Sequence, residues 1–160
     1  MKNNLLLIAL LFSNFSYADT LTGKVVAVID GDTIAVLGPS YQLKKVRFAG
    51  IDAPEKSQDF GNVSKRTLSD LIYNKTVTVE FHKMDPYNRI IGKVTLDGQD
   101  INNEQLKQGM AWFYRKYQYE LPPSDRDIYA ESENHAKHGR LGLWADSHAT
   151  PPWDYRHKGV

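Results

Sequence analysis

Apolar and polar residues alternate along the first third of the chain. Gly23 to Leu37 forms two β-branched runs on either side of Asp30-Gly31, and Tyr41 to Ala49 alternates as a third run. A period of two places alternate side chains on opposite faces of a strand. Asp-Gly between two such runs is typical of a hairpin, because glycine accepts the positive φ that a tight turn requires. The pattern therefore predicts three consecutive strands.

The period then changes. The stretch Gly61 to Asn74 predicts a helix, because its apolar residues recur at helical spacing. Lys75 to Phe81 returns to a period of two and predicts a fourth strand, and Ile90 to Leu96 predicts a fifth that ends at Asp97-Gly98. We therefore expect one helix between the third and fourth strands.

The last part of the chain predicts two more helices. A short one runs around Asn103 to Gln108 before Gly109, and a longer one runs from Ser124 to about His138 before Gly139. Five short strands with helices in these places fit a small barrel better than a βαβ alternation. The predicted fold class is α+β, mainly β: a five-stranded, antiparallel OB-fold barrel with three helices.

The N-terminus has the features of a secretory signal peptide. Lys2 precedes the apolar stretch Leu5 to Phe12, and Ser16-Tyr17-Ala18 is a small-x-small cleavage pattern. We expect residues 1–18 to be removed, a single domain over 19–146 and a loosely attached tail over 147–160. The mature protein would then be secreted or periplasmic, without a membrane segment, and we expect a monomer. The alternative is an uncleaved N-terminal anchor.

Composition and charge limit the classes of partner. The 160 residues contain no cysteine and have a formal net charge of +1. Lys2 is the only charged residue before Asp19, so the mature chain has no net charge. A nucleic acid would therefore have to be held locally by a few placed cations rather than by a basic surface field.

Two acidic residues are expected at neighbouring strand ends. Asp32 and Asp52 would converge at the barrel rim if their strands pair, and two carboxylates with a backbone carbonyl and water suit Ca²⁺ better than Zn²⁺. Glu55, three residues beyond Asp52, would lie near a metal-bound water and could act as a general base. Asp30 is interpreted as a turn-forming acid and not as a ligand. The alternative is a simple turn beside a solvated acid.

Two arginines complete a set suited to phosphodiester chemistry. Arg47 lies within the third predicted strand and Arg89 follows the turn at Asp85-Pro86. A guanidinium can fork onto two phosphate oxygens in a way that lysine cannot. Either arginine alone could equally be half of a surface ion pair.

The order and spacing of four motifs resemble the thermonuclease, or staphylococcal nuclease, family. These are "VIDGDTI" from Val28, "VRFAGIDAPE" from Val46, "YNR" from Tyr87 and "GLW" from Gly142. The resemblance runs from about Gly23 to Trp144. It implies an OB-fold enzyme that cleaves DNA and RNA in a Ca²⁺-dependent way and leaves 3′-phosphate ends.

The resemblance also implies a role for each matching residue. Asp32, Asp52 and the backbone carbonyl of Ala53 would hold Ca²⁺, Glu55 would be the general base, and Arg47 and Arg89 would stabilise the phosphate. Two aromatic residues would contact the terminal nucleotide, and these are Tyr87 and Tyr117. Ala53, Pro86 and Arg115 depart from the residues common in the family, which leaves terminal-nucleotide recognition open.

Other readings stay open. The domain could be a non-catalytic OB-fold module that binds nucleic acid, or Ca²⁺ could be purely structural. Trp112 to Tyr119 interleaves aromatic and cationic residues, and it either lines a nucleic-acid cleft or simply packs. The histidines His82, His135 and His138 are expected to have no role in the chemistry.

Overall fold

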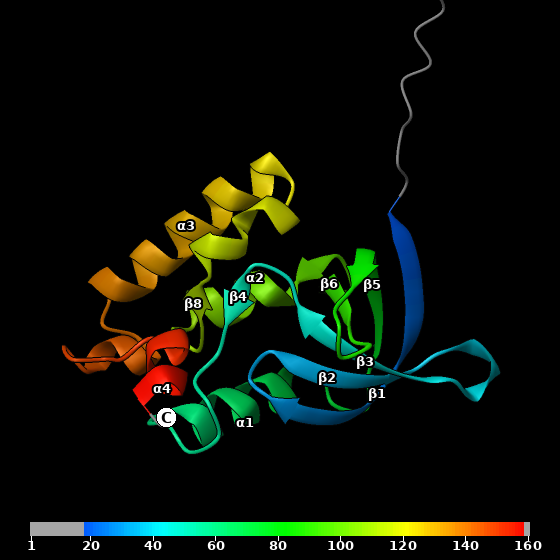
Figure 1. Ribbon diagram of the computed structural model, residues 1–160, viewed down its shortest axis with the longest axis horizontal. Helices are drawn as coiled ribbons and strands as arrows, with labels where there is room; N and C mark the ends of the chain where they lie inside the picture. The colour runs from blue at the N-terminus through cyan, green and yellow to red at the C-terminus, as the bar shows by residue number, and fades with distance from the viewer. Residues whose placement is uncertain (1–17, 159–160) are drawn as a thin grey trace, which may run out of the picture.

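A computed structural model describes residues 18–158. Its centre is a closed barrel of five strands, seen at the right of Figure 1. The strands are β1 (Asp19–Asp30), β2 (Thr33–Leu37), β3 (Leu43–Phe48), β5 (Thr76–Met84) and β6 (Ile90–Leu96). This confirms the predicted five-stranded barrel, and the bounds of β6 are those the alternation predicted.

One pairing in the barrel is parallel, which corrects the expectation of an antiparallel barrel. The sheet order is β3-β2-β1-β5-β6, with antiparallel neighbours, and β3 closes the barrel by pairing in parallel with β6. The parallel register joins Val46 to Ile90 and Phe48 to Gly92. The two strands are far apart in sequence, so alternation within each of them carries no information about this pairing.

Within residues 18–158 there are four α-helices, which lie to one side of the barrel in Figure 1. They are α1 (Gly61–Ile72), α2 (Ile101–Lys107), α3 (Pro123–His138) and α4 (Pro152–Lys158). The first three were predicted, although α2 begins two residues before the expected start because Asp100 caps it, accepting a hydrogen bond from the Asn103 amide at 3.0 Å. Short elements complete the chain, and these are β4 (Ile51–Asp52), β7 (Gln99–Asp100), β8 (Trp112–Phe113) and the 3-10 helices η1 (Pro39–Tyr41), η2 (Arg115–Glu120) and η3 (Gly142–Ala145).

The core fills the barrel and the space beneath α1 and α2. Leu68 and Ile72 of α1 are fully buried, as are Ile101 and Leu106 of α2. Between them, the side-chain amide of Asn102 donates to the carbonyls of Ala49 and Gly92 and accepts from the amide of Val94. This buried amide ties α2 to β6 and to the end of β3, so it holds the closed barrel at the rim where the predicted site lies.

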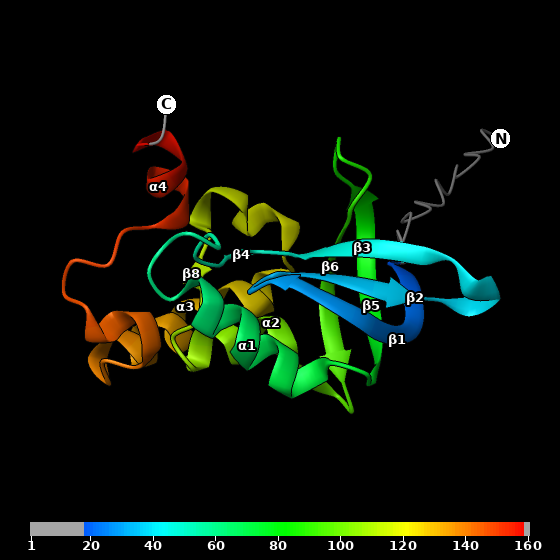
Figure 2. The same cartoon turned by 90° about the horizontal axis from the view of Figure 1, so that it is seen from below.

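The tail is not loosely attached as the sequence suggested. Pro152–Lys158 forms α4, which Figures 1 and 2 show at the end of the molecule that also carries β4. The ring of Trp153 stacks on Tyr114 with centroids 4.8 Å apart and planes at 6°. The tail looked free because it lacks a periodic apolar face, yet a few aromatic contacts are enough to dock it.

The predicted signal peptide lies almost wholly in residues 1–17, outside the described residues. Within residues 18–158, no helix is both long enough and apolar enough to cross a membrane.

Candidate active site at the barrel rim

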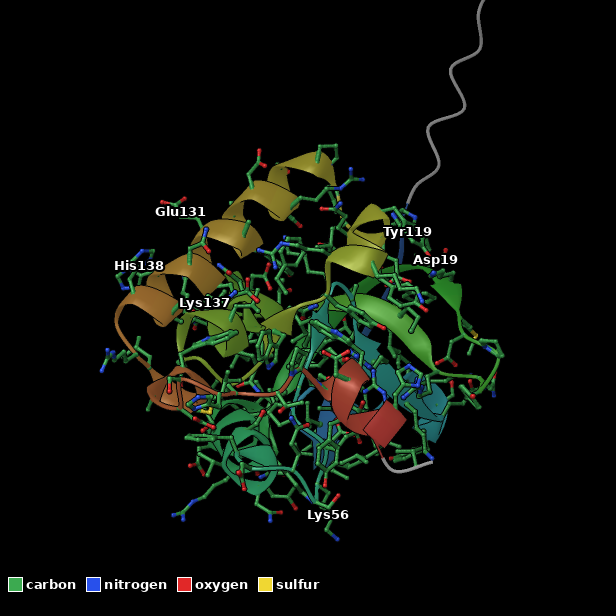
Figure 3. The ribbon with its side chains drawn as sticks, turned by 60° about the vertical axis from the view of Figure 1, so that its left-hand side comes forward. Asp19, Lys56, Tyr119, Glu131, Lys137 and His138 are labelled. Carbon is green, nitrogen blue, oxygen red and sulfur yellow. The ribbon has the colours of Figure 1, made fainter. Side chains whose placement is uncertain are left out.

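A cleft of about 670 Å³ opens at the rim of the barrel. All eight residues predicted for the site line it, although they come from the ends of β1 and β3, the turn after β5, η2 and the loop after β4. They are Asp32, Arg47, Asp52, Ala53, Glu55, Tyr87, Arg89 and Tyr117. Arg156 of α4 lines it too, and the sequence did not single that residue out. In Figure 3 α4, in red, lies in front of the barrel strands.

The turn between β1 and β2 presents Asp32 to the cleft. The Asp32 amide donates to Oδ1 of Asp30 at 3.1 Å, so Asp30 shapes the turn as expected. The Asp32 carboxylate is 4% exposed and accepts hydrogen bonds from the Thr33 hydroxyl at 3.0 Å and the Ala53 amide at 2.6 Å. The turn therefore fixes both oxygens of Asp32 in place.

Gly31 is needed for space rather than for a positive φ, which corrects the expected reason. Its φ is not among the positive values of the chain, but a Cβ atom there would collide with Oγ of Ser64 on α1. The side-chain amide of the buried Gln105 also donates to the Gly31 carbonyl at 2.7 Å. Both α1 and α2 therefore pack closely against the turn that carries Asp32.

Asp30 and Asp32 are close enough for one to disfavour the charge of the other. Burial and the negative charge of Asp32 raise the pKa of Asp30 from 3.8 to about 7. Asp30 is therefore largely protonated in mildly acidic solution, and Asp32 is the residue of the pair that meets Arg47.

Arg47 joins the two buried carboxylates. Its Nε lies 3.3 Å from Asp32 Oδ1 and its Nη2 donates to Asp52 Oδ1 at 2.9 Å. Its Nη1 donates to the carbonyls of Phe48 and Ile51 at 2.8 and 2.7 Å. Burial alone would lower the pKa of Arg47, but the charges of Asp32 and Asp52 outweigh it, so the pKa lies above its ordinary value.

Asp52 is held by the pairing of β4 with β8, where it lies opposite Trp112. It is 2% exposed, and burial raises its pKa, while the hydrogen bond from Arg156 and the charge of Arg47 act in the other direction. The ionised form of Asp52 therefore depends on its two arginine partners.

Glu55 lies in the loop after β4, and its side chain is 39% exposed. The Glu55 amide donates to Oε1 of Gln58 at 3.1 Å. Gly61 begins α1 directly against this loop, because a Cβ there would collide with the Glu55 carbonyl oxygen. The neighbouring Lys56 points outward at the edge of the molecule, away from the cleft (Figure 3).

Arg89 and Tyr87 belong to the turn between β5 and β6. Asp85 organises this turn by accepting hydrogen bonds from the amides of Tyr87 and Arg89 and from Arg89 Nε at 2.7 Å. Partial burial acts to raise the pKa of Asp85, but these hydrogen bonds outweigh it and the pKa is lowered. The Arg89 guanidinium lies 5.6 Å from the ring centre of Tyr87, whose side chain is 80% exposed.

The stretch Trp112 to Tyr119 both packs and lines the cleft. Phe113 is buried, whereas Tyr114 and Tyr117 reach the cleft with ring centroids 4.8 Å apart. Tyr114 also borders a second hollow of about 460 Å³ that contains Trp153 and several cationic side chains, and these are Arg115, Lys116 and Lys137. Aromatic and cationic groups therefore continue from the cleft along the surface beside α4.

The three histidines considered in the sequence, His82, His135 and His138, do not line the cleft. His135 and His138 are exposed on α3, where His138 points outward (Figure 3), and His82 is exposed on β5. His138 Nδ1 lies 2.8 Å from the carbonyl oxygen of Asn134.

The side chains in the cleft suit a hard cation. Asp32, Asp52 and Glu55 offer only oxygen atoms, which are the donors that Ca²⁺ takes and which suit Zn²⁺ poorly. Within the described part of the chain, no three acidic or histidine side chains gather in an arrangement that encloses a metal. The carboxylates of Asp32 and Asp52, which the sequence assigned to Ca²⁺, contact Arg47, and Asp52 also accepts from Arg156.

Comparison with known proteins places this cleft in a family. Residues 45–146 match the model of the family described as "Staphylococcal nuclease homologue". The chain belongs to the staphylococcal nuclease family. A protein of Escherichia coli named "Uncharacterized endonuclease" is 37% identical over 159 residues, covering 99% of each chain. A second protein of that name, from Haemophilus influenzae, is 43% identical over 84% of this chain and 72% of its own. A "Micrococcal nuclease" of Shigella flexneri is 39% identical over 93% of this chain and 87% of its own.

The family match covers most of the cleft but not all of it. It includes Arg47, Asp52, Glu55 and Arg89, while Asp32 precedes it and Arg156 follows it. The E. coli relative aligns over nearly the whole chain, so its similarity extends to both ends. The staphylococcal nuclease region and the segments that flank it therefore build the cleft together.

The composition of the C-terminal tail could have indicated that the segment carrying Arg156 packs against the domain. Residues 147–160 hold two prolines, a tryptophan and a tyrosine among polar residues, and Pro152 stands where a helix can begin. Aromatic residues at this density in a short tail indicate docking rather than a solvated end. The sequence did not indicate which surface the tail would cover.

Proposed function

We propose that this protein is a Ca²⁺-dependent nuclease that hydrolyses phosphodiester bonds of DNA and RNA. The observation that carries the proposal is one cleft in which three guanidinium groups, two buried carboxylates and a half-exposed carboxylate converge. The names of its relatives, endonuclease and micrococcal nuclease, support a nucleic-acid substrate.

The two arginines divide the work of holding the phosphate. A guanidinium has five donor N–H groups; Arg47 gives three of them to Asp52 and two carbonyls, and its Nε forms an ion pair with Asp32. Arg89 gives its Nε to Asp85, and within the described residues no hydrogen bond engages its two terminal nitrogens. Arg89 is therefore the guanidinium that can fork onto the phosphate, while Arg47 mainly fixes the acids.

Glu55 serves as the general base in this proposal. Its carboxylate takes a proton from the attacking water, the new bond forms at phosphorus, the bond from phosphorus to the 5′ oxygen breaks, and that oxygen takes up a proton from solvent. The products are a 3′-phosphate and a 5′-hydroxyl. Asp32, Asp52 and the Ala53 carbonyl would hold Ca²⁺, which when bound supplies positive charge to the phosphate oxygens.

Tyr87 and Tyr117 supply contacts to the terminal nucleotide. Both line the cleft, and Tyr87 exposes most of its ring on a turn whose shape Asp85 fixes. An aromatic face binds any base by stacking, so these contacts add affinity with little sequence preference.

A digest tests the proposal. The protein without residues 1–18 is mixed with 5′-labelled single-stranded DNA or RNA, with Ca²⁺ or with a chelator, and the ends of the products are identified. We expect cleavage with Ca²⁺ only and 3′-phosphate ends. DNA that is retained in a gel shift but never cut would instead support a non-catalytic OB-fold module, and Ca²⁺ that raises Tm without any cleavage would support a purely structural ion.

We further propose that the protein works as a monomer outside the cytoplasm, after removal of residues 1–18. The support is the n-region, apolar stretch and small-residue pattern of the N-terminus. N-terminal sequencing of the protein from the periplasm or medium should begin at Asp19, and size-exclusion with light scattering should give one chain.

A further inference from the structure

Arg156 contacts both Asp52, the proposed Ca²⁺ ligand, and Glu55, the proposed general base. Its Nη1 donates to Glu55 Oε1 at 2.6 Å, and its Nη2 donates to Asp52 Oδ2 at 2.8 Å. The hydrogen bond to Asp52 and burial act in opposite directions on the pKa of Arg156, and the hydrogen bond prevails, so the pKa is raised. A permanent cation therefore lies between Asp52 and Glu55.

The segment that carries Arg156 also grips the loop that carries Glu55. The Tyr155 hydroxyl donates to the Ser57 carbonyl at 3.1 Å, and the side-chain amide of Gln58 donates to the Thr150 carbonyl at 2.5 Å. The stack of Trp153 on Tyr114 anchors α4 to the wall of the cleft. Three residues of the C-terminal segment therefore hold the loop from Glu55 to Gln58, and the contact of Trp153 with Tyr114 holds α4 in place.

Glu55 needs such support because the barrel does not provide it. Among the described residues, Arg156 is the hydrogen-bond partner of the Glu55 carboxylate, and it uses only Oε1. Oε2 is left to accept a proton. Charge-assisted hydrogen bonds fix an exposed carboxylate in one orientation, and a general base acts efficiently only when its orientation is fixed.

We propose that Arg156 is a positioning residue that acts through Glu55, and that α4 is therefore part of the active site. The proposal rests on the proposed nuclease function. Arg156 holds Oε1 of Glu55 at a set place relative to Asp52, so that Oε2 faces the water that attacks the phosphate. Neither proton nor electron passes through Arg156.

The test is a double-mutant cycle in the protein without residues 1–18. Arg156→Gln and Arg156→Ala are compared with wild type, with Glu55→Gln and with each double variant, and Arg66→Ala on the exposed face of α1 is the control. We expect kcat of the Arg156 variants to fall by roughly a hundredfold with KM changed far less, as for a misplaced catalytic group. Arg156→Lys should recover part of the loss.

The double-mutant cycle distinguishes positioning of Glu55 from a purely structural role of Arg156. In the Glu55→Gln background, loss of Arg156 should cost no more than about twofold, because residues that act through one another are not additive. Trp fluorescence and Tm show whether α4 stays docked in each variant. Arg156→Gln keeps the first three side-chain carbons and an amide donor without the charge, in case Arg156→Ala undocks the helix.

Three results would overturn the proposal. An unchanged kcat in Arg156→Gln with a docked helix removes the role, and an equal loss in both backgrounds shows that Arg156 acts on substrate directly. A higher turnover together with a Ca²⁺-induced Tm shift at lower Ca²⁺ shows that Arg156 competes with the cation instead. If wild type itself cuts no nucleic acid, the proposed function fails first, so the two failures are distinguishable.

Discussion

The two walls of the cleft are built in different ways. Asp32 and Asp52 are almost fully buried, and Arg47 between them forms an ion pair with Asp32 and a hydrogen bond with Asp52. Glu55 and Arg89 lie on a loop and a turn, are partly exposed, and are each held by one opposite charge, Arg156 and Asp85 respectively. We call the first group, Asp32, Arg47 and Asp52, the acid wall, and the second group, Glu55 and Arg89, the loop wall. The barrel fixes the acid wall as part of its core, whereas the loop wall depends on a few specific ion pairs. Changes to the first group should affect both stability and turnover, and changes to the second should affect mainly turnover.

The largest separation of the two effects is expected at Arg89. Arg89→Ala should lower kcat by about 10²- to 10³-fold, because it removes the guanidinium that is free to fork onto the phosphate. Its unfolding free energy should change by no more than about 0.5 kcal/mol, as for a partly exposed side chain. Initial rates on a labelled oligonucleotide and denaturant unfolding measure both. A variant that unfolds readily would show that the turn is part of the core, contrary to the comparison.

At Asp52 we expect a loss of stability in addition to a loss of turnover. Asp52→Asn leaves Arg47 buried with one partner fewer, and breaking a buried ion pair from one side costs about 3 kcal/mol of unfolding free energy. Unfolding in urea with and without Ca²⁺ checks this, with Asp70→Asn on the exposed face of α1 as the matched control. The wild-type protein should gain stability from Ca²⁺ and the variant should gain much less. Equal gains would exclude Asp52 as a ligand.

A smaller loss of kcat is expected at Asp85, which orients Arg89 but is not expected to contact the substrate itself. Asp85→Asn keeps an oxygen that accepts the amide hydrogen bonds of the turn but removes the charge opposite Arg89. We expect kcat to fall by roughly tenfold and Tm to fall by a few degrees, since one charge-assisted hydrogen bond contributes about 1.5 kcal/mol or more. A fall as large as that of Arg89→Ala would mean that Asp85 itself touches the substrate.

The same contrast explains what the sequence could predict. The alternation of Gly23 to Leu37 predicted the hairpin, and the motifs predicted which side chains would meet, because both are local patterns with known consequences. Two contacts join segments far apart in the chain: the parallel pairing of β3 with β6 and the hydrogen bonds of the Asn102 side-chain amide. No local periodicity in the sequence predicts them. Gly31 was predicted for the wrong reason, since only the packed fold shows Ser64 beside it.

The loop wall was the harder one to predict. Glu55 was identified from its spacing to Asp52, but its partner Arg156 lies 101 residues further along the chain. The tail has too few apolar residues to show helical periodicity, so its docking depends on single contacts such as Trp153 on Tyr114. Contacts of this kind become visible only when the side chains are placed.

Turnover of Glu55→Gln under saturating DNA tests the central claim most directly. Glu131→Gln, whose side chain points outward from α3 in Figure 3, is the matched control. The account predicts that Glu55→Gln loses about 10²- to 10⁴-fold in kcat while its affinity for DNA and its Tm stay near those of wild type. Glu131→Gln should remain fully active. A Glu55→Gln protein that cuts DNA at the wild-type rate would contradict the account, because no general base would then act from this position.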